Sequence, residues 1–139
     1  MKNILSVPVS PGEVLDRLSI LQIKENHASS EQQKQIIKKE SELFEKAWID
    51  CFGNNPKISN DFTDLLFINS ELWNLENDVR ACEKSCQFGN DFINSARKIY
   101  LTNDKRADAK ASINKKLHSD IFDIKIFLLN NKESINESP

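Results

Sequence analysis

Two stretches near the middle of the chain place large polar side chains at helical spacing. The first is Trp73-x-x-Glu76-x-x-x-Arg80-x-x-Glu83, and the second is Arg97-x-x-Tyr100-x-x-Asn103-Asp104-x-Arg106-x-x-x-Lys110-x-x-x-Asn114. Placing such groups at or beside the buried face of a helix costs free energy unless they pair with each other or bind a ligand. The two stretches therefore indicate where a site lies, although they name no reaction.

The cations of these stretches suit the binding of an anion. Four are available: Arg80, Arg97, Arg106 and Lys110. The planar guanidinium fork of arginine matches a carboxylate or a phosphate. Three acids, Glu76, Glu83 and Asp104, would hold the cations in place or bind a proton or a metal. Glu76 and Asp104 are the candidates for a catalytic acid or base.

The remaining side chains would complete a cleft between two helices. Trp73 and Tyr100 offer flat walls for a ring or a sugar. Glu13, Asp16 and Arg17, near the N-terminus, would close the cleft from another helix. The expected ligand-binding residues are Trp73, Arg80, Glu83, Arg97, Tyr100, Asn103, Arg106, Lys110, Asn114, Asp16 and Arg17. We assign no metal ligands and no particular cofactor.

Simpler interpretations of both stretches remain open. Glu76, Arg80 and Glu83 are spaced to form ordinary ion pairs on a helix surface. The polar residues after Tyr100 are also explained if the helix rotates its buried face or restarts near Asn103. A single buried asparagine can also fix the register of a helical bundle.

Other chemistries find little support. There is no Gly-x-Gly-x-x-Gly, no phosphate-binding glycine loop and no Gly-x-Ser-x-Gly. The two histidines, His27 and His118, lie outside both stretches, which argues against Ser-His or Cys-His catalysis. The cysteines Cys51, Cys82 and Cys86 lack the partners of a zinc site, and we expect them to be buried as small apolar residues.

Size and composition predict one helical domain over residues 1–139, with an extended lead-in at 1–9 and a flexible tail at 131–139. The formal charge of −2 gives no reason to expect nucleic acid, and 39% hydrophobic with 29% charged residues is typical of a soluble protein. An odd cysteine count without a signal sequence indicates the cytoplasm. No run approaches the ~20 apolar residues of a membrane helix, so we expect no membrane insertion.

Capping signals predict where the first two helices begin. Ser10-Pro11-Gly12-Glu13 combines an N-cap serine, a proline at the first helical position and a capping-box glutamate, and the helix runs to about Asn26. A second capping box at 29–33 begins another helix, which the turn residues at 53–56 end.

A long antiparallel hairpin is predicted to follow. The third helix starts near Asn60 or Asp61 and carries an apolar seam at Leu65, Ile68, Leu72, Leu75, Val79, Cys82 and Cys86. A tight loop at 87–90 follows, with Gly89 as a left-handed cap and Asn90 as the next N-cap. The fourth helix continues the seam at Phe92/Ile93, Ala96, Tyr100, Asn103, Ala107, Lys110, Asn114 and Leu117, unless it breaks at 102–103. The expected fold is an all-α antiparallel bundle of four to five helices.

The segment 121–129 is too apolar for a single buried stripe. It contains Ile121, Phe122, Ile124, Ile126, Phe127, Leu128 and Leu129. We expect it either to pack on two sides or to form an interface with a second copy or another protein.

Several motifs together resemble a bacterial family of unknown function. They are Ser10-Pro11-Gly12-Glu13, the run Leu15 to Leu21, both stretches described above, and Phe88-Gly89, and they span about residues 8 to 114. Members of that family are often encoded near glycosyltransferase and lipopolysaccharide genes. The resemblance implies a link to cell-surface carbohydrate, but no established activity, substrate or catalytic residue. If the segment 121–129 docks on a partner, that partner is a glycosyltransferase or a second copy of the chain. Asn77 stands where the family favours an acid, which weakens a metal site here.

Two weaker likenesses fit less well. All-helical nucleotide pyrophosphohydrolases bind magnesium through Glu-x-x-Glu and a later Glu-x-x-Asp, a pair that is missing near Glu76. Helical chorismate mutases use Arg, Lys and Glu inside a bundle, but in another order. The leading expectation is therefore a protein that binds an anionic small molecule, such as a sugar phosphate or nucleotide sugar. The alternatives are a non-enzymatic interaction module and a metal-dependent hydrolase of nucleotides or phosphate esters.

Overall fold

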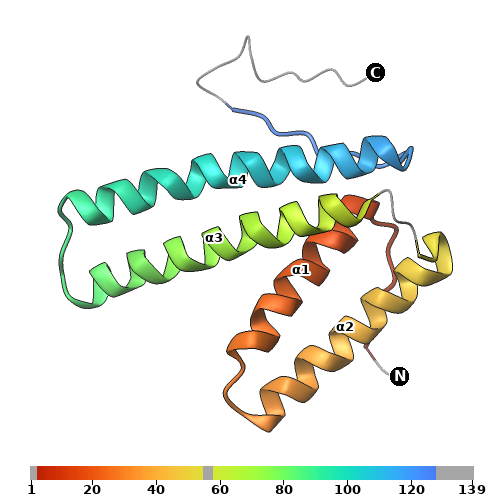
Figure 1. Ribbon diagram of the computed structural model, residues 1–139, viewed down its shortest axis with the longest axis horizontal. Helices are drawn as coiled ribbons and strands as arrows, with labels where there is room; N and C mark the ends of the chain where they lie inside the picture. Colours follow the sequence, from red (N-terminus) through yellow and green to blue (C-terminus); the bar gives the residue numbers. More distant parts are fainter. Residues whose placement is uncertain (1–2, 55–57, 128–139) are drawn as a thin grey trace.

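The chain folds into four helices, seen in a computed structural model that describes residues 3–54 and 58–127 (Figure 1). They are α1 (Pro11–His27), α2 (Glu31–Phe52), α3 (Ser59–Lys84) and α4 (Asn90–Lys116). No strand occurs within these ranges, and α3 and α4 form a long antiparallel hairpin. The prediction of an all-α bundle of four helices is confirmed. None of the helices in the described ranges is long and apolar enough to cross a membrane.

Both predicted N-caps of the first half are present. The hydroxyl of Ser10 accepts a hydrogen bond from the N–H of Glu13 at 3.2 Å, and Pro11 is the first helical residue. The hydroxyl of Ser30 accepts from the N–H of Gln33 at 3.2 Å. These bonds satisfy N–H groups that have no partner within the helix, so the sequence determines where α1 and α2 begin.

The loop between α3 and α4 differs in detail from its prediction. Cys86, with φ of 53°, is the residue in the left-handed conformation, whereas Gly89 has φ of −82°. Gly89 is the N-cap of α4, and Asn90 is its first helical residue. The left-handed residue falls directly after the turn that ends α3, because Ser85 and Cys86 bond back to Ala81 and Glu83.

Helix α4 is continuous, so the predicted break at 102–103 does not occur. Its inward face runs through Thr102, Arg106, Ala109 and Ile113. Tyr100 is 56% exposed, and its prediction as a seam residue is wrong. The buried face passes through Ile99 and Thr102 on either side of it, so a shift of one position moves Tyr100 outward.

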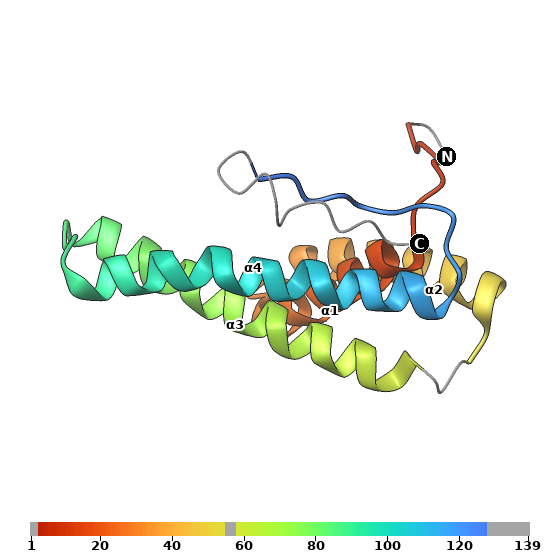
Figure 2. The same ribbon diagram turned by 90° about the horizontal axis from the view of Figure 1, so that it is seen from above.

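The core lies where α1 crosses the hairpin. Leu15, Ile58, Leu65 and Ile113 are buried together, with Leu18, Trp48, Phe62, Ala109 and Leu117 packed against them. Helix α1 contacts α2, α3 and α4, so it joins the two halves of the molecule (Figures 1 and 2). Helix α2 packs on α1 and has no fully buried residue.

Residues 121–127 form no helix or strand and run back along α4 (Figure 2). Their apolar side chains are exposed, from 41% for Ile121 to 74% for Ile124 and Ile126. The expectation that this part packs on two sides is therefore wrong. Leu128, Leu129 and the predicted tail lie outside the described residues. The described lead-in, residues 3–9, has no regular secondary structure.

Candidate functional site

A buried ion pair joins α1 to α4. The guanidinium of Arg106 donates from Nε to Oδ1 of Asp16 at 2.9 Å and from Nη2 to Oδ2 at 2.5 Å. The side chain of Asp16 is 2% exposed, and that of Arg106 is 31% exposed. Two parallel hydrogen bonds fix the plane of the guanidinium. The pair places one edge of Arg106 in the core and leaves three of its five N–H donors without a hydrogen bond to the described residues.

Asn69 and Ser19 complete the surroundings of this carboxylate. The amide of Asn69 donates to Asp16 Oδ1 at 2.9 Å and to the Ser19 hydroxyl at 2.7 Å. That hydroxyl donates in turn to the main-chain oxygen of Asp16 at 2.7 Å. No buried side-chain polar atom in the described residues lacks a partner. The network therefore links α1, α3 and α4 without leaving an unpaired buried group.

Sequence reasoning missed Asn69, although a signal was present. Asn69 lies four residues after Leu65 and three before Leu72, a spacing that belongs to the buried face of α3. We assigned this step of the seam to Ile68, which is only half-buried, while Asn69 is 5% exposed. A polar residue at an i+3/i+4 seam position was the clue.

The surroundings shift the pKa values of these groups. Burial raises the pKa of Asp16, but hydrogen bonds from Arg106 and Asn69 and the charges of Arg106 and Lys110 outweigh it and hold that pKa below its ordinary value. The hydrogen bond to Asp16 raises the pKa of Arg106, against the opposing effect of burial. Both groups are therefore charged at neutral pH.

Two of the predicted α4 residues make structural contacts to the start of α1. Burial lowers the pKa of Lys110, but its hydrogen bond to Glu13 and the charge of Glu13 raise it above its ordinary value. Lys110 Nζ lies 2.6 Å from Glu13 Oε2 and 3.3 Å from Asp123 Oδ2. The side-chain oxygen of Asn114 accepts a hydrogen bond from the N–H of Gly12 at 2.7 Å. Neither Lys110 nor Asn114 lines the pocket described next.

A pocket of about 500 Å³ lies beside the Asp16–Arg106 pair, where α1 meets α3 and α4. Its apolar lining consists of Ile20, Ile23, Leu72 and Trp73, and its polar lining of Asn69, Glu76, Asn77, Arg80, Asn103 and Arg106. The structure thus brings together five of the residues singled out in the sequence: Trp73, Glu76, Arg80, Asn103 and Arg106. With six polar and four apolar lining residues, this pocket is more polar than the mainly apolar pockets that are typical of small-molecule sites.

Trp73 is held in place from the end of α1. Its ring lies 4.8 Å from that of His27, between centroids, with 33° between the planes. His27 Nδ1 is 2.9 Å from the main-chain oxygen of Ile23, so its ring is fixed as well. The indole therefore forms a supported wall of the pocket.

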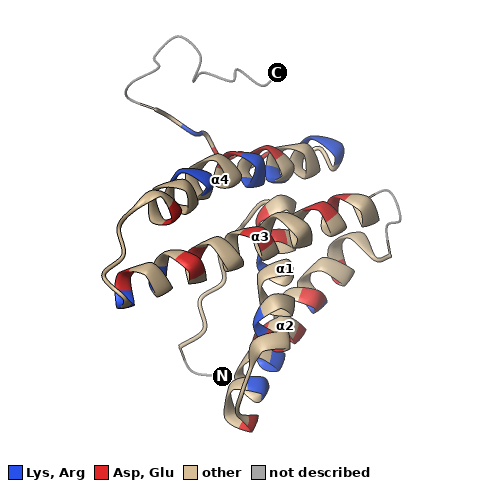
Figure 3. Ribbon diagram, turned by 60° about the vertical axis from the view of Figure 1, so that its left-hand side comes forward, with Lys and Arg blue, Asp and Glu red and all other residues tan. Residues whose placement is uncertain are grey.

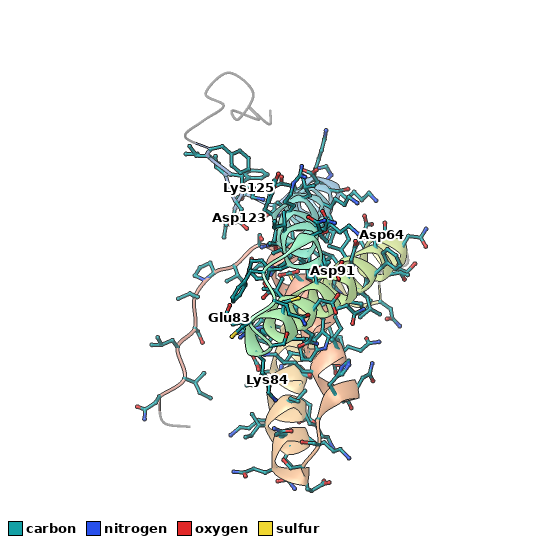
Figure 4. All side chains as sticks on the ribbon, turned by 90° about the vertical axis from the view of Figure 1, so that its left-hand side faces the viewer. Asp64, Glu83, Lys84, Asp91, Asp123 and Lys125 are labelled. Atoms are coloured by element: carbon teal, nitrogen blue, oxygen red, sulfur yellow. The ribbon has the colours of Figure 1, made fainter. Side chains whose placement is uncertain are left out.

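The other predicted site residues lie elsewhere. Arg17 pairs with Glu40 of α2 at 3.1 Å, and Asp104 pairs with Lys125. Glu83, Arg97 and Tyr100 are exposed and do not line the pocket. Figure 4, a view from the hairpin end, shows Glu83 on the end of α3 and Asp123 and Lys125 beside α4. The anticipated single cleft over both stretches thus reduces to a pocket that takes Trp73, Glu76 and Arg80 from the first stretch and Asn103 and Arg106 from the second.

Charge is divided between the two helices of the hairpin (Figure 3). Helix α3 contains six acidic and two basic residues, and α4 contains three acidic and seven basic ones. Because the helices pack side by side, each partly neutralises the other. Arg80 departs from this division as a cation on the acidic helix, and it lies on the pocket.

The cysteines and acids do not form a metal site. Among the described residues no group of three or more His, Cys, Asp or Glu side chains is close enough to hold an ion. All three cysteines are free thiols, and Cys51 and Cys86 are exposed. Their expected burial is therefore wrong for these two: Cys51 lies on an exposed side of the last turn of α2, and Cys86 lies in the exposed turn that follows α3.

Comparison with known proteins adds no homologue to this description. No family model, no curated protein and no solved structure matches the chain. The resemblance to a family linked with cell-surface carbohydrate therefore stays a prediction that rests on the motifs alone.

Proposed function

We propose that the pocket beside Arg106 binds a small anionic molecule that contains a ring, with a sugar phosphate or a nucleotide sugar as the leading class. The observation that carries this proposal is the placement of Arg80 and Arg106 on one pocket with the indole of Trp73. Arginine suits phosphate, and a flat aromatic wall suits the apolar face of a sugar or a base.

Arg106 is the pre-positioned half of the anion site. Its bidentate contact with Asp16 fixes the guanidinium before any ligand arrives. A group held in this way loses little conformational freedom on binding. Its charge is balanced by Asp16, so Arg106 mainly supplies directed N–H donors.

Arg80 supplies the uncompensated charge. It is exposed and makes no hydrogen bond or ion pair with another described residue. Of the charged groups that line the pocket, Arg80 and Arg106 are positive and Glu76 is negative. Because Asp16 already balances Arg106, the attraction for an anion depends on Arg80, whose guanidinium has no ion pair with another described residue.

The other polar residues of the pocket would form hydrogen bonds with hydroxyl groups of the ligand. Glu76 offers a carboxylate, while Asn77 and Asn103 offer amides that both donate and accept hydrogen bonds. Glu76 is also the one candidate acid or base on the pocket, since Asp104 is paired with Lys125 outside it. Whether the site turns over its ligand depends on Glu76.

Replacing Arg80 by glutamine tests the proposal. Thermal-shift and calorimetric titrations with sugar phosphates, nucleoside diphosphate sugars and free phosphate should show binding to the native protein. Arg80→Gln should lose it. The matched control is Arg97→Gln, which removes the same charge from an exposed position off the pocket and should leave binding intact. Equal loss in the two variants, or binding that survives Arg80→Gln, contradicts the assignment.

A second function is supported by the segment 121–127. Five of its apolar side chains are exposed, and ion pairs of Asp123 with Lys110 and of Lys125 with Asp104 hold it along α4. Such a surface suits docking on another protein, a glycosyltransferase in the leading version. Ending the chain after Asp120 should abolish that association and leave ligand binding intact. Loss of ligand binding without loss of a partner contradicts this function.

The resemblance of the motifs is the reason to connect the ligand with cell-surface polysaccharide synthesis. The three free thiols support a cytoplasmic place of action for this proposal. A metal-dependent hydrolase is less favoured, because Glu76, Glu83 and Asp104 form no cluster among the described residues.

A further inference from the structure

The side chain of Asn69 is almost fully buried, yet one of its polar atoms has no partner. Asn69 is 5% exposed and lies on α3. A side-chain amide offers two N–H donors on its nitrogen and one oxygen that accepts. Both donors of Nδ2 are used, to Asp16 Oδ1 at 2.9 Å and to the Ser19 hydroxyl at 2.7 Å. No group of the described residues donates to Oδ1 of Asn69.

The neighbours of this amide fix its orientation. The carboxylate of Asp16, which is paired with Arg106, can only accept hydrogen bonds. The hydroxyl of Ser19 already donates its proton to the main-chain oxygen of Asp16, so toward Asn69 it acts as an acceptor. Turning the amide over would place Oδ1 against a carboxylate oxygen and break both hydrogen bonds of Nδ2. Oδ1 of Asn69 is therefore an acceptor in a fixed position.

This oxygen opens onto the pocket beside Arg106. Asn69 is one of the residues that line this pocket of about 500 Å³. Every buried side-chain polar atom of the described residues has a partner, so Oδ1, which has none, is not enclosed by protein. The pocket is where the otherwise buried side chain of Asn69 meets solvent.

Asn69 and Arg106 are neighbours, because both donate to the same oxygen. Asp16 Oδ1 lies 2.9 Å from Asn69 Nδ2 and 2.9 Å from Arg106 Nε. The pocket thus presents the free N–H donors of Arg106 beside the acceptor of Asn69. A phosphate oxygen complements the donors, but the acceptor repels it. The acceptor requires a donor on the ligand.

We propose that Asn69 determines the specificity of the pocket, by accepting a hydrogen bond from a hydroxyl that the ligand carries next to its anionic group. This inference rests on the proposed binding of an anion by Arg80 and Arg106, and it adds which anions are selected. In a sugar 1-phosphate, the hydroxyl on carbon 2 has the required position. An ammonium group would also donate, but the two guanidinium groups disfavour a further cation.

The physical basis of the selection is the desolvation of Oδ1. A bound ligand covers this oxygen and removes it from water. If the ligand lacks a donor there, the acceptor stays unpaired, and a site built to bind a hydroxyl discriminates against the analogue without it. The loss of one such hydrogen bond corresponds to about a tenfold weaker affinity.

Calorimetric titration of the native protein with three probes tests this selection. The probes are glucose 1-phosphate, 2-deoxyglucose 1-phosphate and inorganic phosphate. Glucose 1-phosphate should bind about tenfold more tightly than its 2-deoxy analogue. Equal affinities, with phosphate binding that Arg80→Gln abolishes, overturn this inference and leave the proposed anion site standing. If none of the three probes binds, the proposed function fails and this inference fails with it.

Replacing Asn69 by leucine assigns the preference to its side chain. Leucine has a similar volume and no acceptor, so Asn69→Leu should bind the two sugar phosphates with equal affinity and inorganic phosphate as the native protein does. The matched control is Ser19→Ala, which removes a buried partner of the same amide, lies off the pocket and leaves Oδ1 in place. Ser19→Ala should keep the preference. A preference that persists in Asn69→Leu, or that Ser19→Ala abolishes as well, overturns the inference.

A third set of variants decides the case in which Asn69→Leu does not fold. Glu76→Ala, Asn77→Ala and Asn103→Ala each remove another acceptor that lines the pocket. None of these three residues is fully buried, so the variants are expected to fold. They can weaken the binding of both sugar phosphates, but the tenfold ratio between the two should remain in each variant if Asn69 accepts from the hydroxyl. Loss of the ratio in any of them would place the contact with that hydroxyl elsewhere and overturn the inference.

Discussion

The N–H of Gly12 donates a hydrogen bond of 2.7 Å to the side chain of Asn114, across 102 residues of sequence. Gly12 is the second residue of α1, so its N–H has no partner within its own helix. Asn114 is 2% exposed and supplies that partner from the last turns of α4. A residue that breaks an apolar seam in the sequence is thus a cap for another helix.

Replacing Asn114 by leucine should lower the free energy of unfolding by about 1–3 kcal/mol, because the Gly12 N–H loses its acceptor in a buried position. Chemical denaturation measures the loss. Asn94→Leu is the control, since Asn94 is an exposed residue of the same helix. If the free energy of unfolding falls by the same amount in both variants, the hydrogen bond between Gly12 and Asn114 does not contribute to stability.

Gly12→Ala should also destabilise the protein, although alanine normally favours a helix. A Cβ at this position would lie 2.6 Å from the main-chain oxygen of Lys110 and 2.8 Å from Asn114 Oδ1. Helices α1 and α4 must then separate, at a cost of about 1–3 kcal/mol. Adding Asn114→Ser should restore only part of the loss, because the contact with the backbone of Lys110 remains. A more stable Gly12→Ala variant contradicts the close packing.

The fold could be predicted from the sequence wherever the determinants are local. Ser10 and Ser30 mark the starts of α1 and α2, and the apolar periodicity marks the α3–α4 hairpin. These signals act within a few residues of themselves, so they need no knowledge of the tertiary structure.

The site could be predicted only in part, because it depends on where α1 crosses the hairpin. Trp73, Arg80 and Arg106 meet at that crossing, while Arg97 and Tyr100, on the same helix as Arg106, do not. A sequence pattern predicts which side of a helix is buried. It does not predict which part of the helix, along its length, contacts a neighbouring helix. For the same reason the pairing of Asp16 with Arg106, 90 residues apart, could not be read from spacing.

Asp16 should make the free energy of unfolding decrease at acidic pH. Its pKa is lowered in the folded protein, so its contribution is fully present above the unfolded value, near pH 4, and is lost as the pH falls through the folded value. The pKa values of Arg106 and Lys110 are raised, so their contributions are lost only in strong alkali. Unfolding free energies of the native protein should therefore fall below about pH 4, and those of Asp16→Asn should fall less. Parallel curves would show that another carboxylate is responsible.

Lys110→Met should weaken the fold and spare the pocket. The change removes the contacts to Glu13 and Asp123, and because both carboxylates are partly exposed we expect a loss of only about 1 kcal/mol. Ligands that bind the native protein should bind this variant equally well once it is folded, unlike Arg80→Gln. Weaker ligand binding by folded Lys110→Met would show that Lys110 contributes to ligand binding, as the sequence predicted.

Arg106→Met should be the most damaging of these changes. It leaves the carboxylate of Asp16 buried without its cation, and breaking one partner of a buried pair costs about 3–5 kcal/mol, with the lower end expected because the Arg106 side chain is 31% exposed. Asp16→Asn in the same chain should recover part of that stability, since Asn69 can still donate a hydrogen bond to the side-chain oxygen of a neutral amide at this position. Additive losses in the double variant, measured by denaturation, would show that the two groups act independently. Recovery would identify Asp16 as the residue that positions Arg106, and ligand titration of the refolded double variant would then separate the role of Arg106 in binding from its role in the fold.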